Sequence, residues 1–293
     1  MGKLKNNKVT QEIKIIQIKL EELMKKVLVD FDNTINVRGC DIDDAFALFF
    51  LLSHKDVEVV GITTTFGNSN EDDTYNSTVM MNNDLGINIP LKKGGIYSYD
   101  AAKFIKDTVE SEKVSLISLG STTNTMKALA LGMDTKNLTE FVQMGGITSP
   151  LYFKGMVMDE LNMSIDFLAT NYVLERIESP VIITGNNCIE KKYKVKDGEY
   201  ISKYMRYLDS HMRRWKAEFE IKYKEEEIVI WDALTALYVT NPEFFETQKR
   251  KIRLGENMMT GYLEEGEDKE ILIPRLKDTV DAMDYIVSII ENN

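Results

Sequence analysis

Five aspartates lie close together near the N-terminal end of the sequence, around the end of one apolar run and the start of the next. They are Asp30, Asp32, Asp41, Asp43 and Asp44. Capping of a helix N-terminus accounts for one or two such aspartates, but not for five. Two carboxylates about 4 Å apart repel each other by roughly 4 kcal/mol at an effective dielectric constant of 20. Because a hard divalent cation held by oxygen ligands relieves this repulsion, the cluster favours a metal site over a purely structural role.

The elements that must position these carboxylates alternate along the chain. β-branched runs predict strands at residues 27–31, 57–64, 114–119, 141–144 and 181–184, and helical patterns between them include 43–53 and 124–131. This alternation predicts an α/β fold: a single domain with a mostly parallel open sheet flanked by helices. Ligands of such sheets bind at the carboxyl ends of the strands, so the residues after each run are the candidate site residues.

The composition excludes several classes of protein. The 293 residues carry a formal net charge of −11, which argues against a nucleic-acid partner. A hydrophobic fraction of 43% with only 5 prolines is sufficient for a full core. The two cysteines, Cys40 and Cys188, provide no disulfide framework and fit a reducing cytoplasm. The longest apolar run, 45–52, is too short to span a bilayer, so no membrane partner is expected.

Two segments differ from the predicted α/β domain, which we assign to residues 24–293. Residues 1–23 carry apolar side chains at helical spacing, and Met24 lies just before the first predicted strand. We therefore expect residues 1–23 to be an N-terminal extension that is either not native or loosely attached. Residues 191–227 are dense in Lys, Glu, Tyr and Arg, which predicts a helical insertion near the mouth of the site.

One family resemblance is confined to residues 27–34. This segment is similar to the opening motif of haloacid-dehalogenase-type phosphatases, in which the first aspartate attacks phosphate and the second acts as acid and base. That family also requires a late Gly-Asp motif to complete a magnesium site. The nearest match to that motif here is Asp197-Gly198-Glu199, so no second motif supports the phosphatase alternative.

From about residue 27 to the C-terminus, the sequence resembles the inosine-uridine-preferring nucleoside hydrolases. Six short motifs occur in the family's order. They are Asp30-x-Asp32 with Asp41-x-Asp43-Asp44-Ala45; Ile62-Thr63-Thr64 with Gly67-Asn68; Leu119-Gly120 with Thr123-Asn124; Met144-Gly145-Gly146; Glu160-Leu161-Asn162 with Asp166; and Asp232-Ala233-Leu234. Each motif alone is weak, but the ordered set identifies the chain as similar to this family.

The resemblance implies calcium-dependent hydrolysis of the N-glycosidic bond of ribonucleosides or a related N-riboside, giving ribose and free base, as in purine and pyrimidine nucleoside salvage. The Ca²⁺ ligands that it implies are Asp32, Asp44, Asp232 and the backbone carbonyl of Leu119. Asp32 would also take a proton from the water that attacks the anomeric carbon, and Asp30 would orient Asp32. Because family members are often dimers or tetramers, a homo-oligomer is expected.

The remaining substrate contacts expected from this comparison are Asp43, Asn68, Met144, Glu160, Asn162 and Trp231. Most of these positions also have a plainer interpretation. Asn68 can be a turn residue, Glu160 and Asn162 can be polar groups of a surface loop, and Met144 can fill the core. Asp232 can be an ordinary helix cap.

Three features depart from the family pattern. The loop 33–40 is longer than usual and must bulge out, which Gly39 permits. The asparagine that commonly precedes the Glu-x-Asn motif has no clear counterpart in 149–158. Many purine-accepting members carry a histidine immediately before the late aspartate as leaving-group acid, and this chain has Trp231 there.

The third departure affects function most, because a positioned general acid contributes about 10²- to 10⁴-fold to a rate. The candidates for base contact or proton donation are Tyr207, His211 and Tyr223, whereas His54 is expected to face solvent. Trp231 can stack on a base or fill the core. If leaving-group activation is lost altogether, the chain is a catalytically weak protein that binds a ribose or nucleoside.

Overall fold

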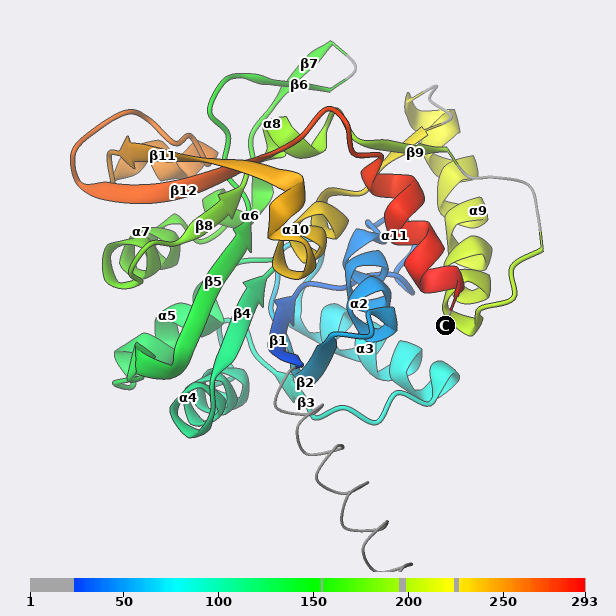
Figure 1. The fold of residues 1–293 in the computed structure, drawn as a ribbon, viewed down its shortest axis with the longest axis horizontal. Coiled ribbons are helices and arrows are strands. Elements are labelled where there is room, and N and C mark those ends of the chain that lie inside the picture. Colours follow the sequence, from blue (N-terminus) through cyan, green and yellow to red (C-terminus); the bar gives the residue numbers. More distant parts are fainter. Residues whose placement is uncertain (1–23, 154, 195–198, 224–226, 293) are drawn as a thin grey trace, which may run out of the picture.

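The computed structural model describes residues 24–153, 155–194, 199–223 and 227–292, with the side chains of all of them except 218–223. Its centre is an eight-stranded sheet in the order β11-β12-β8-β5-β4-β1-β2-β3 (Figure 1). Along this order the strands span Phe245–Ile252, Lys269–Leu276, Val181–Ile183, Leu138–Met144, Val114–Ser118, Lys25–Phe31, Val57–Thr64 and Leu91–Lys93. All neighbours pair in parallel except β11 and β12. The predicted single α/β domain with a mostly parallel sheet is confirmed.

Helices cover both faces of the sheet, because successive side chains of a strand point to opposite sides. On β1, Val27, Val29 and Phe31 belong to one buried cluster, and Leu28 belongs to another. The first cluster includes α2 (Asp43–Ser53), α10 (Trp231–Thr240) and α11 (Ala282–Glu291). The second includes α4 (Asp100–Ser111), α5 (Thr123–Ala130) and α7 (Phe167–Arg176), on the other side of the sheet in Figure 1.

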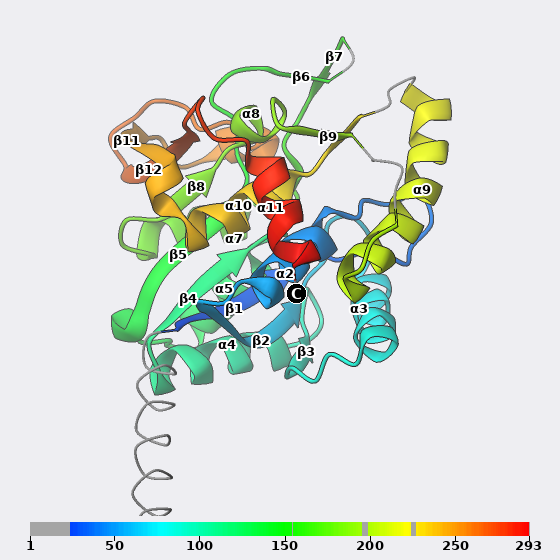
Figure 2. The same ribbon diagram turned by 45° about the vertical axis from the view of Figure 1, so that its right-hand side comes forward.

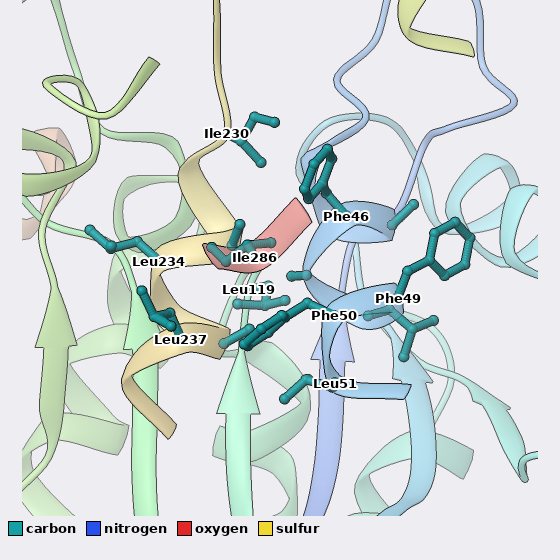
Figure 3. Packing of buried hydrophobic residues seen from close by; sticks show 14 of the residues in the cluster. Phe46, Phe49, Phe50, Leu51, Leu119, Ile230, Leu234, Leu237 and Ile286 are labelled. Carbon is teal, nitrogen blue, oxygen red and sulfur yellow. The ribbon is translucent and has the colours of Figure 1, made fainter. Parts of the chain in front are cut away.

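Two helices of the first face, α2 and α10, pack directly against each other (Figure 3). Phe50 of α2 points towards α10, whose Leu234 and Leu237 are buried in the same cluster. On the other side of α2, Phe49 stacks on Tyr204 of α9 (Lys203–Tyr223), with ring centroids 4.8 Å apart. Because α2 is enclosed by its neighbours, its first residues are fixed relative to the start of α10.

Apart from the 15-residue helix α3, the remaining elements are short, and several extend beyond the carboxyl ends of the strands, as the β6–β7 hairpin does at the top of Figures 1 and 2. They are α3 (Glu71–Leu85), β6 (Leu151–Phe153), β7 (Met156–Met158), α6 (Leu161–Ser164), α8 (Gly185–Cys188), β9 (Lys192–Lys194), β10 (Glu227–Val229), and the 3₁₀ turns Thr135–Asn137, Pro242–Phe244 and Glu256–Thr260. In the region of the predicted helical insertion, one long helix, α9, lies between β9 and β10, which pair antiparallel.

Local sequence patterns were sufficient to predict the central strands and two of the helices. All five predicted strands and both predicted helices occur within a few residues of their expected bounds. The expectation for His54 was wrong: it ends α2 with 8% of its surface exposed, and its ring lies 5.8 Å from that of Phe50. Residues 1–23 lie outside the described residues, so the expected extension stays a prediction. In the described ranges, no helix is long and apolar enough to cross a membrane.

The packing between α2 and α10 predicts different effects for two buried phenylalanines. Phe50→Ala should lower the free energy of unfolding by about 3 to 5 kcal/mol, the usual cost of a large cavity. Phe141→Ala, in the cluster on the opposite face, should cost a similar amount. Only Phe50→Ala should also weaken metal binding, because Phe50 packs between α2 and α10 and Phe141 does not. Chemical denaturation and metal titration of both variants test this, and equal metal affinities would contradict it.

Candidate functional site

The acidic cluster forms where the starts of α2 and α10 meet. Carboxylate oxygens of Asp43, Asp44 and Asp232 lie within 4.8 Å of one another, and all three side chains are buried. Asp43 and Asp44 are the first residues of α2, and Asp232 is the second residue of α10. Because the N-terminus of each helix carries a partial positive charge, both helices favour these carboxylates in their ionised form. The backbone N–H of Trp231 donates to Asp43 Oδ2 at 3.1 Å.

Asp32 joins this cluster from the carboxyl end of β1. Its carboxylate accepts hydrogen bonds from the backbone N–H of Asn68, at 2.7 Å, and from the Asn68 side-chain amide, at 3.3 Å. The same amide lies 3.4 Å from Asp44 Oδ2, and the backbone N–H of Asp32 donates to Asp44 Oδ1 at 3.3 Å. Asn68 therefore orients Asp32 and links it to Asp44.

Two glycines let the backbone approach Asp32 closely. A Cβ atom on Gly67 would lie 2.0 Å from Asp32 Oδ2, a distance that no real contact allows. A Cβ atom on Gly120 would lie 2.7 Å from the Thr65 methyl group and 3.1 Å from Asp32 Cγ. Both glycines occur in the motifs of the sequence resemblance, and their structural role is to leave room for this carboxylate.

Asp30 lies beside the cluster and bonds to other partners. Its Oδ1 accepts hydrogen bonds from the Thr63 hydroxyl at 2.7 Å and from the Asn124 amide at 2.8 Å. Within the described residues its buried Oδ2 has no hydrogen-bond partner. No hydrogen bond joins Asp30 to Asp32 in the described part of the chain, so Asp30 connects β1 to β2 and α5 rather than orienting Asp32 directly.

Burial and mutual repulsion raise the pKa values of the whole group. Burial raises the pKa of Asp32 to about 7, against the backbone hydrogen bond from Asn68, which lowers it. Burial likewise raises the pKa of Asp30 to about 7, with a smaller contribution from Asp32. For Asp44 and Asp232, burial and then neighbouring carboxylates hold the pKa well above the usual range. The charged neighbours that shift the pKa values of these four groups are all carboxylates. A bound cation would therefore stabilise the ionised forms of the group.

The donor set fits a hard divalent cation. Asp43 Oδ1 is buried without a hydrogen-bond partner among the described atoms, beside two further carboxylates. An unpaired buried carboxylate oxygen is costly unless a cation or donor meets it. The oxygens that could hold an ion belong to Asp32, Asp43, Asp44 and Asp232. The carbonyl of Leu119, another expected ligand, accepts a hydrogen bond from the Asn162 amide at 3.1 Å.

A cavity of about 150 Å³ opens beside the acidic cluster. Of the expected site residues, those that line it are Asp43, Asn68, Leu119, Met144, Glu160, Asn162, Trp231 and Asp232. Asp32 and Asp44 do not line it, but both accept hydrogen bonds from Asn68, which does. The family resemblance assigned no specific role to the other lining residues, which are Asp41, Leu151, Met158, Asp159, Leu161 and Gly185. Only Asp41 carried a signal, because it belongs to the aspartate motif.

Glu160 and Asn162 lie on one side of this cavity and are held by the short helix α6. Both oxygens of Glu160 accept backbone N–H groups, from Asn162 at 2.7 Å and from Met163 at 2.8 Å. Glu160 therefore caps α6 and still lines the cavity, and it is buried rather than a polar group of a surface loop. The Asn162 amide bridges the carbonyls of Leu119 and Met144.

His211 and Tyr207, two of the residues expected on the leaving-group side, do not line the cavity. His211 Nε2 lies 3.1 Å from Asn36 Oδ1, and the Tyr207 hydroxyl bonds to Asn36 and to Asp84. Both side chains therefore contact the loop 33–40 and do not line the cavity. The expectation that they contact the base or donate a proton to it is corrected accordingly. The side chain of Tyr223 lies outside the described residues.

A second cavity, of about 270 Å³, adjoins the first. The two share Asp41, Met158 and Trp231, and the second is completed by Phe153, Met156, Val157, Trp215 and Val229. Asp41 is partly exposed, and burial of its carboxyl group raises its pKa to about 6. The site therefore has an acidic compartment, which holds most of the carboxylates, and an aromatic one, and Asp41 lines both.

The parallel sheet brings buried carboxylates together at its carboxyl edge, where a divalent cation could bind. A family model described as inosine-uridine preferring nucleoside hydrolase matches residues 96–278, more than half of the chain. The chain belongs to this family. It is accordingly a hydrolase of N-glycosyl compounds, from a metal-dependent family whose members bind small-molecule nucleosides. The phosphatase alternative is excluded by this membership.

Solved structures show the same fold. A purine-preferring ribonucleoside hydrolase from Gardnerella vaginalis is 16% identical, with 92% of this chain and 98% of that chain covered and a TM-score of 0.77. A plant nucleoside hydrolase is 17% identical, with 92% and 98% covered and a TM-score of 0.76. An inosine-uridine preferring nucleoside hydrolase from Bacillus anthracis is 17% identical, with 92% and 100% covered and a TM-score of 0.73. A search of curated protein sequences gave no match.

The contact between Gly67 and Asp32 predicts a selective defect. Gly67→Ala should displace the Asp32 carboxylate, because the added Cβ would overlap Oδ2. We expect at least tenfold weaker metal binding, with a circular dichroism spectrum and secondary structure that are unchanged. Isothermal titration with a divalent cation measures this. Unchanged affinity in a folded Gly67→Ala protein would show that Asp32 takes no part in the metal site.

The raised pKa values predict an unusual pH dependence for the protein without metal. Between about pH 4 and 7 the folded state binds more protons than the unfolded state, because Asp30 and Asp32 titrate near 7 instead of 3.8. This contribution to stability is complete at low pH and is lost as the pH rises through 7. Chelator-treated protein should therefore melt at a higher temperature at pH 5.5 than at pH 8, and an added divalent cation should reverse the order.

Asp32→Asn provides the control for this pH effect, since an amide does not titrate in this range. Thermal denaturation of the chelated variant should show a smaller difference between the two pH values. Wild-type protein that is more stable at pH 8 than at pH 5.5 in chelator would contradict the assignment of these carboxyl groups.

Proposed function

We propose that this protein is a calcium-dependent N-ribohydrolase that cleaves the N-glycosidic bond of ribonucleosides or a related N-riboside, giving ribose and free base. The observation that carries the proposal is the buried cluster of Asp32, Asp43, Asp44 and Asp232 beside a cavity of about 150 Å³. Family membership supplies the reaction class. The identity of the ion and the roles of individual residues are part of the proposal.

Calcium is the ion that this donor set favours. Asp32, Asp44, Asp232 and the carbonyl of Leu119 would hold it, and all-oxygen ligation rich in carboxylates suits Ca²⁺. When bound, the ion supplies positive charge that lowers the pKa of water and binds hydroxyl groups of ribose. The second lone pair of the Leu119 carbonyl is available, since the Asn162 amide occupies only one.

Asp32 is the proposed general base. Its two oxygens are oriented by the backbone and side chain of Asn68, so the carboxylate has one fixed direction at the end of β1. In this role Asp32 accepts the proton of the water that attacks the anomeric carbon. Burial raises the pKa of Asp32 to about 7 in the metal-free protein, and a bound cation would lower it and keep the carboxylate ionised, as a general base requires.

The acidic groups lining the cavity are proposed to hold the sugar. Asp43 would accept hydrogen bonds from ribose hydroxyls, and the Asn68 amide would donate to them. Asn162 would add a further contact from α6. The transition state of glycosidic cleavage resembles an oxocarbenium ion, and nearby carboxylates stabilise its positive charge. Glu160 contributes charge in this way even though both of its oxygens cap α6.

A cytoplasmic role in nucleoside salvage and assembly into dimers or tetramers complete the proposal. The two cysteines, which form no disulfide, support a cytoplasmic location. The frequent occurrence of dimers and tetramers in the family supports the assembly. Size-exclusion chromatography with light scattering measures the assembly state directly.

Ribose release is the measurement that tests this function. A reducing-sugar assay on purine, pyrimidine and nicotinamide ribosides should show turnover with Ca²⁺ and none with chelator. Asp32→Ala should lower turnover by about 10²-fold or more, the usual contribution of a general base. Asp107→Asn, which removes a carboxylate from an exposed position on α4, is the matched control and should leave turnover unchanged.

A second candidate, a ribose- or nucleoside-binding protein without turnover, is favoured by one observation: none of the described side chains at either cavity is a histidine, lysine or arginine. Calcium-dependent binding of a nucleoside without release of ribose from any riboside would support this candidate and contradict hydrolysis.

A further inference from the structure

The second cavity has the lining of an aromatic binding pocket. Trp215 comes from α9, Trp231 from the start of α10, and Phe153 from the β6–β7 hairpin. Both tryptophans are half-buried, so part of each side chain is exposed. They are also the only two tryptophans of the sequence. In Figures 1 and 2, α9, α10 and the hairpin come from three different parts of the chain around the carboxyl edge of the sheet.

Asp41 places a negative charge between this pocket and the acidic compartment. It lines both cavities, and its Oδ1 accepts the backbone N–H of Ile42 at 3.0 Å. Among the described residues, no lysine, arginine or histidine lines either cavity, and Asp159 adds a further carboxylate to the first. Asp41 reaches this place because the long loop after β1, which turns at Gly39 with φ of 79°, ends beside the cavity.

We propose that this pocket selects a cationic heteroaromatic base, so that the preferred substrates are N-ribosides of an N7-alkylated purine or of a pyridinium. This inference rests on the proposed N-ribohydrolase function and names its substrate class. Aromatic faces attract a cation through their quadrupole, with tryptophan the strongest, and a carboxylate beside them adds direct charge attraction. The net charge of −11 also favours the encounter with a cation.

The same substrate class accounts for the absence of a leaving-group acid. When the C–N bond of a neutral nucleoside breaks, both electrons go to the base nitrogen, and the base must gain a proton to leave. A cationic base takes the same electron pair and leaves neutral without a proton. Water adds to the anomeric carbon and its proton goes to Asp32, so the products are ribose, neutral base and one proton. Hydrolysis of such a substrate therefore needs no acidic side chain at the position of Trp231. It also does not need His211, which hydrogen-bonds to Asn36 instead.

Binding is tested with a probe that cannot be hydrolysed. The N-methylnicotinamide cation and neutral nicotinamide have the same ring and differ in the methyl group and its charge. Since both tryptophans line the pocket, intrinsic fluorescence of the calcium-loaded protein reports on it. We expect saturable quenching by the cation with at least tenfold tighter binding than nicotinamide, and Asp41→Asn should remove most of that difference. Asp107→Asn, with the same loss of charge on α4, should keep it.

Turnover is tested with 7-methylguanosine and guanosine, each rate divided by its uncatalysed rate. The cationic substrate should have at least a tenfold higher normalised kcat/KM. Asp41→Asn should lower that value at least tenfold more for 7-methylguanosine than for guanosine, whereas Asp107→Asn should lower neither. Equal quenching by the two nicotinamide probes, or an Asp41→Asn variant with unchanged selectivity, would overturn the inference.

The two proposals fail in different ways. Hydrolysis of guanosine and 7-methylguanosine with equal normalised efficiency, unaffected by Asp41→Asn, would leave the proposed function standing and overturn the cationic selectivity. Saturable, Asp41-dependent binding of the N-methylnicotinamide cation without release of ribose from any substrate would support the selectivity of the pocket and contradict the hydrolase function.

Discussion

The site depends on the packing of α2 against α10, which holds together carboxylates that repel one another. Asp43 and Asp44 start one helix and Asp232 starts the other, and their oxygens come within 4.8 Å. Each additional carboxylate in such a group costs several kcal/mol of repulsion in the absence of a cation. The apolar contact that includes Phe50 and Leu237 offsets this cost, because burial of large side chains stabilises the pair of helices whatever the charge state of their ends.

The parallel sheet adds the remaining groups to this arrangement. Asp32 follows β1, Asn68 follows β2, and Leu119 follows β4, and these three strands are neighbours. Since parallel strands end at the same edge, residues distant in sequence meet there without any long connection. Gly67 and Gly120 then decide how close the backbone comes to Asp32, which sets the direction of the proposed general base.

The long loop after β1 connects the acidic cluster to α9. Asn36 bonds to both Tyr207 and His211, and Arg214 donates to the carbonyl of Ile35 at 3.4 Å. These contacts join the loop that ends at Asp41 to the helix that carries Trp215. One set of hydrogen bonds therefore couples the position of the Asp41 carboxylate to that of Trp215, which forms one wall of the second cavity.

The sequence by itself determined the elements with strong local signals. The first strand, the helix that starts at Asp43 and the parallel architecture follow from periodicity and alternation, which act over a few residues. The antiparallel edge strand β11 was not predicted, because its exposed positions carry charged side chains that protect a sheet edge and hide the pattern of a buried strand. Clustered aspartates indicated a metal site because their repulsion has few other remedies.

Only the tertiary structure decided which of the candidate side chains meet. His211 lies on Asn36 and not at the cavity, Asp30 bonds to Thr63 and Asn124, and Glu160 caps α6 while facing the cavity. The position of Asp41 between two cavities depends on the path of a loop and on two helices from the far end of the sequence. Spacing along the chain does not encode such relations, because they arise when separate elements bury their apolar faces against one sheet.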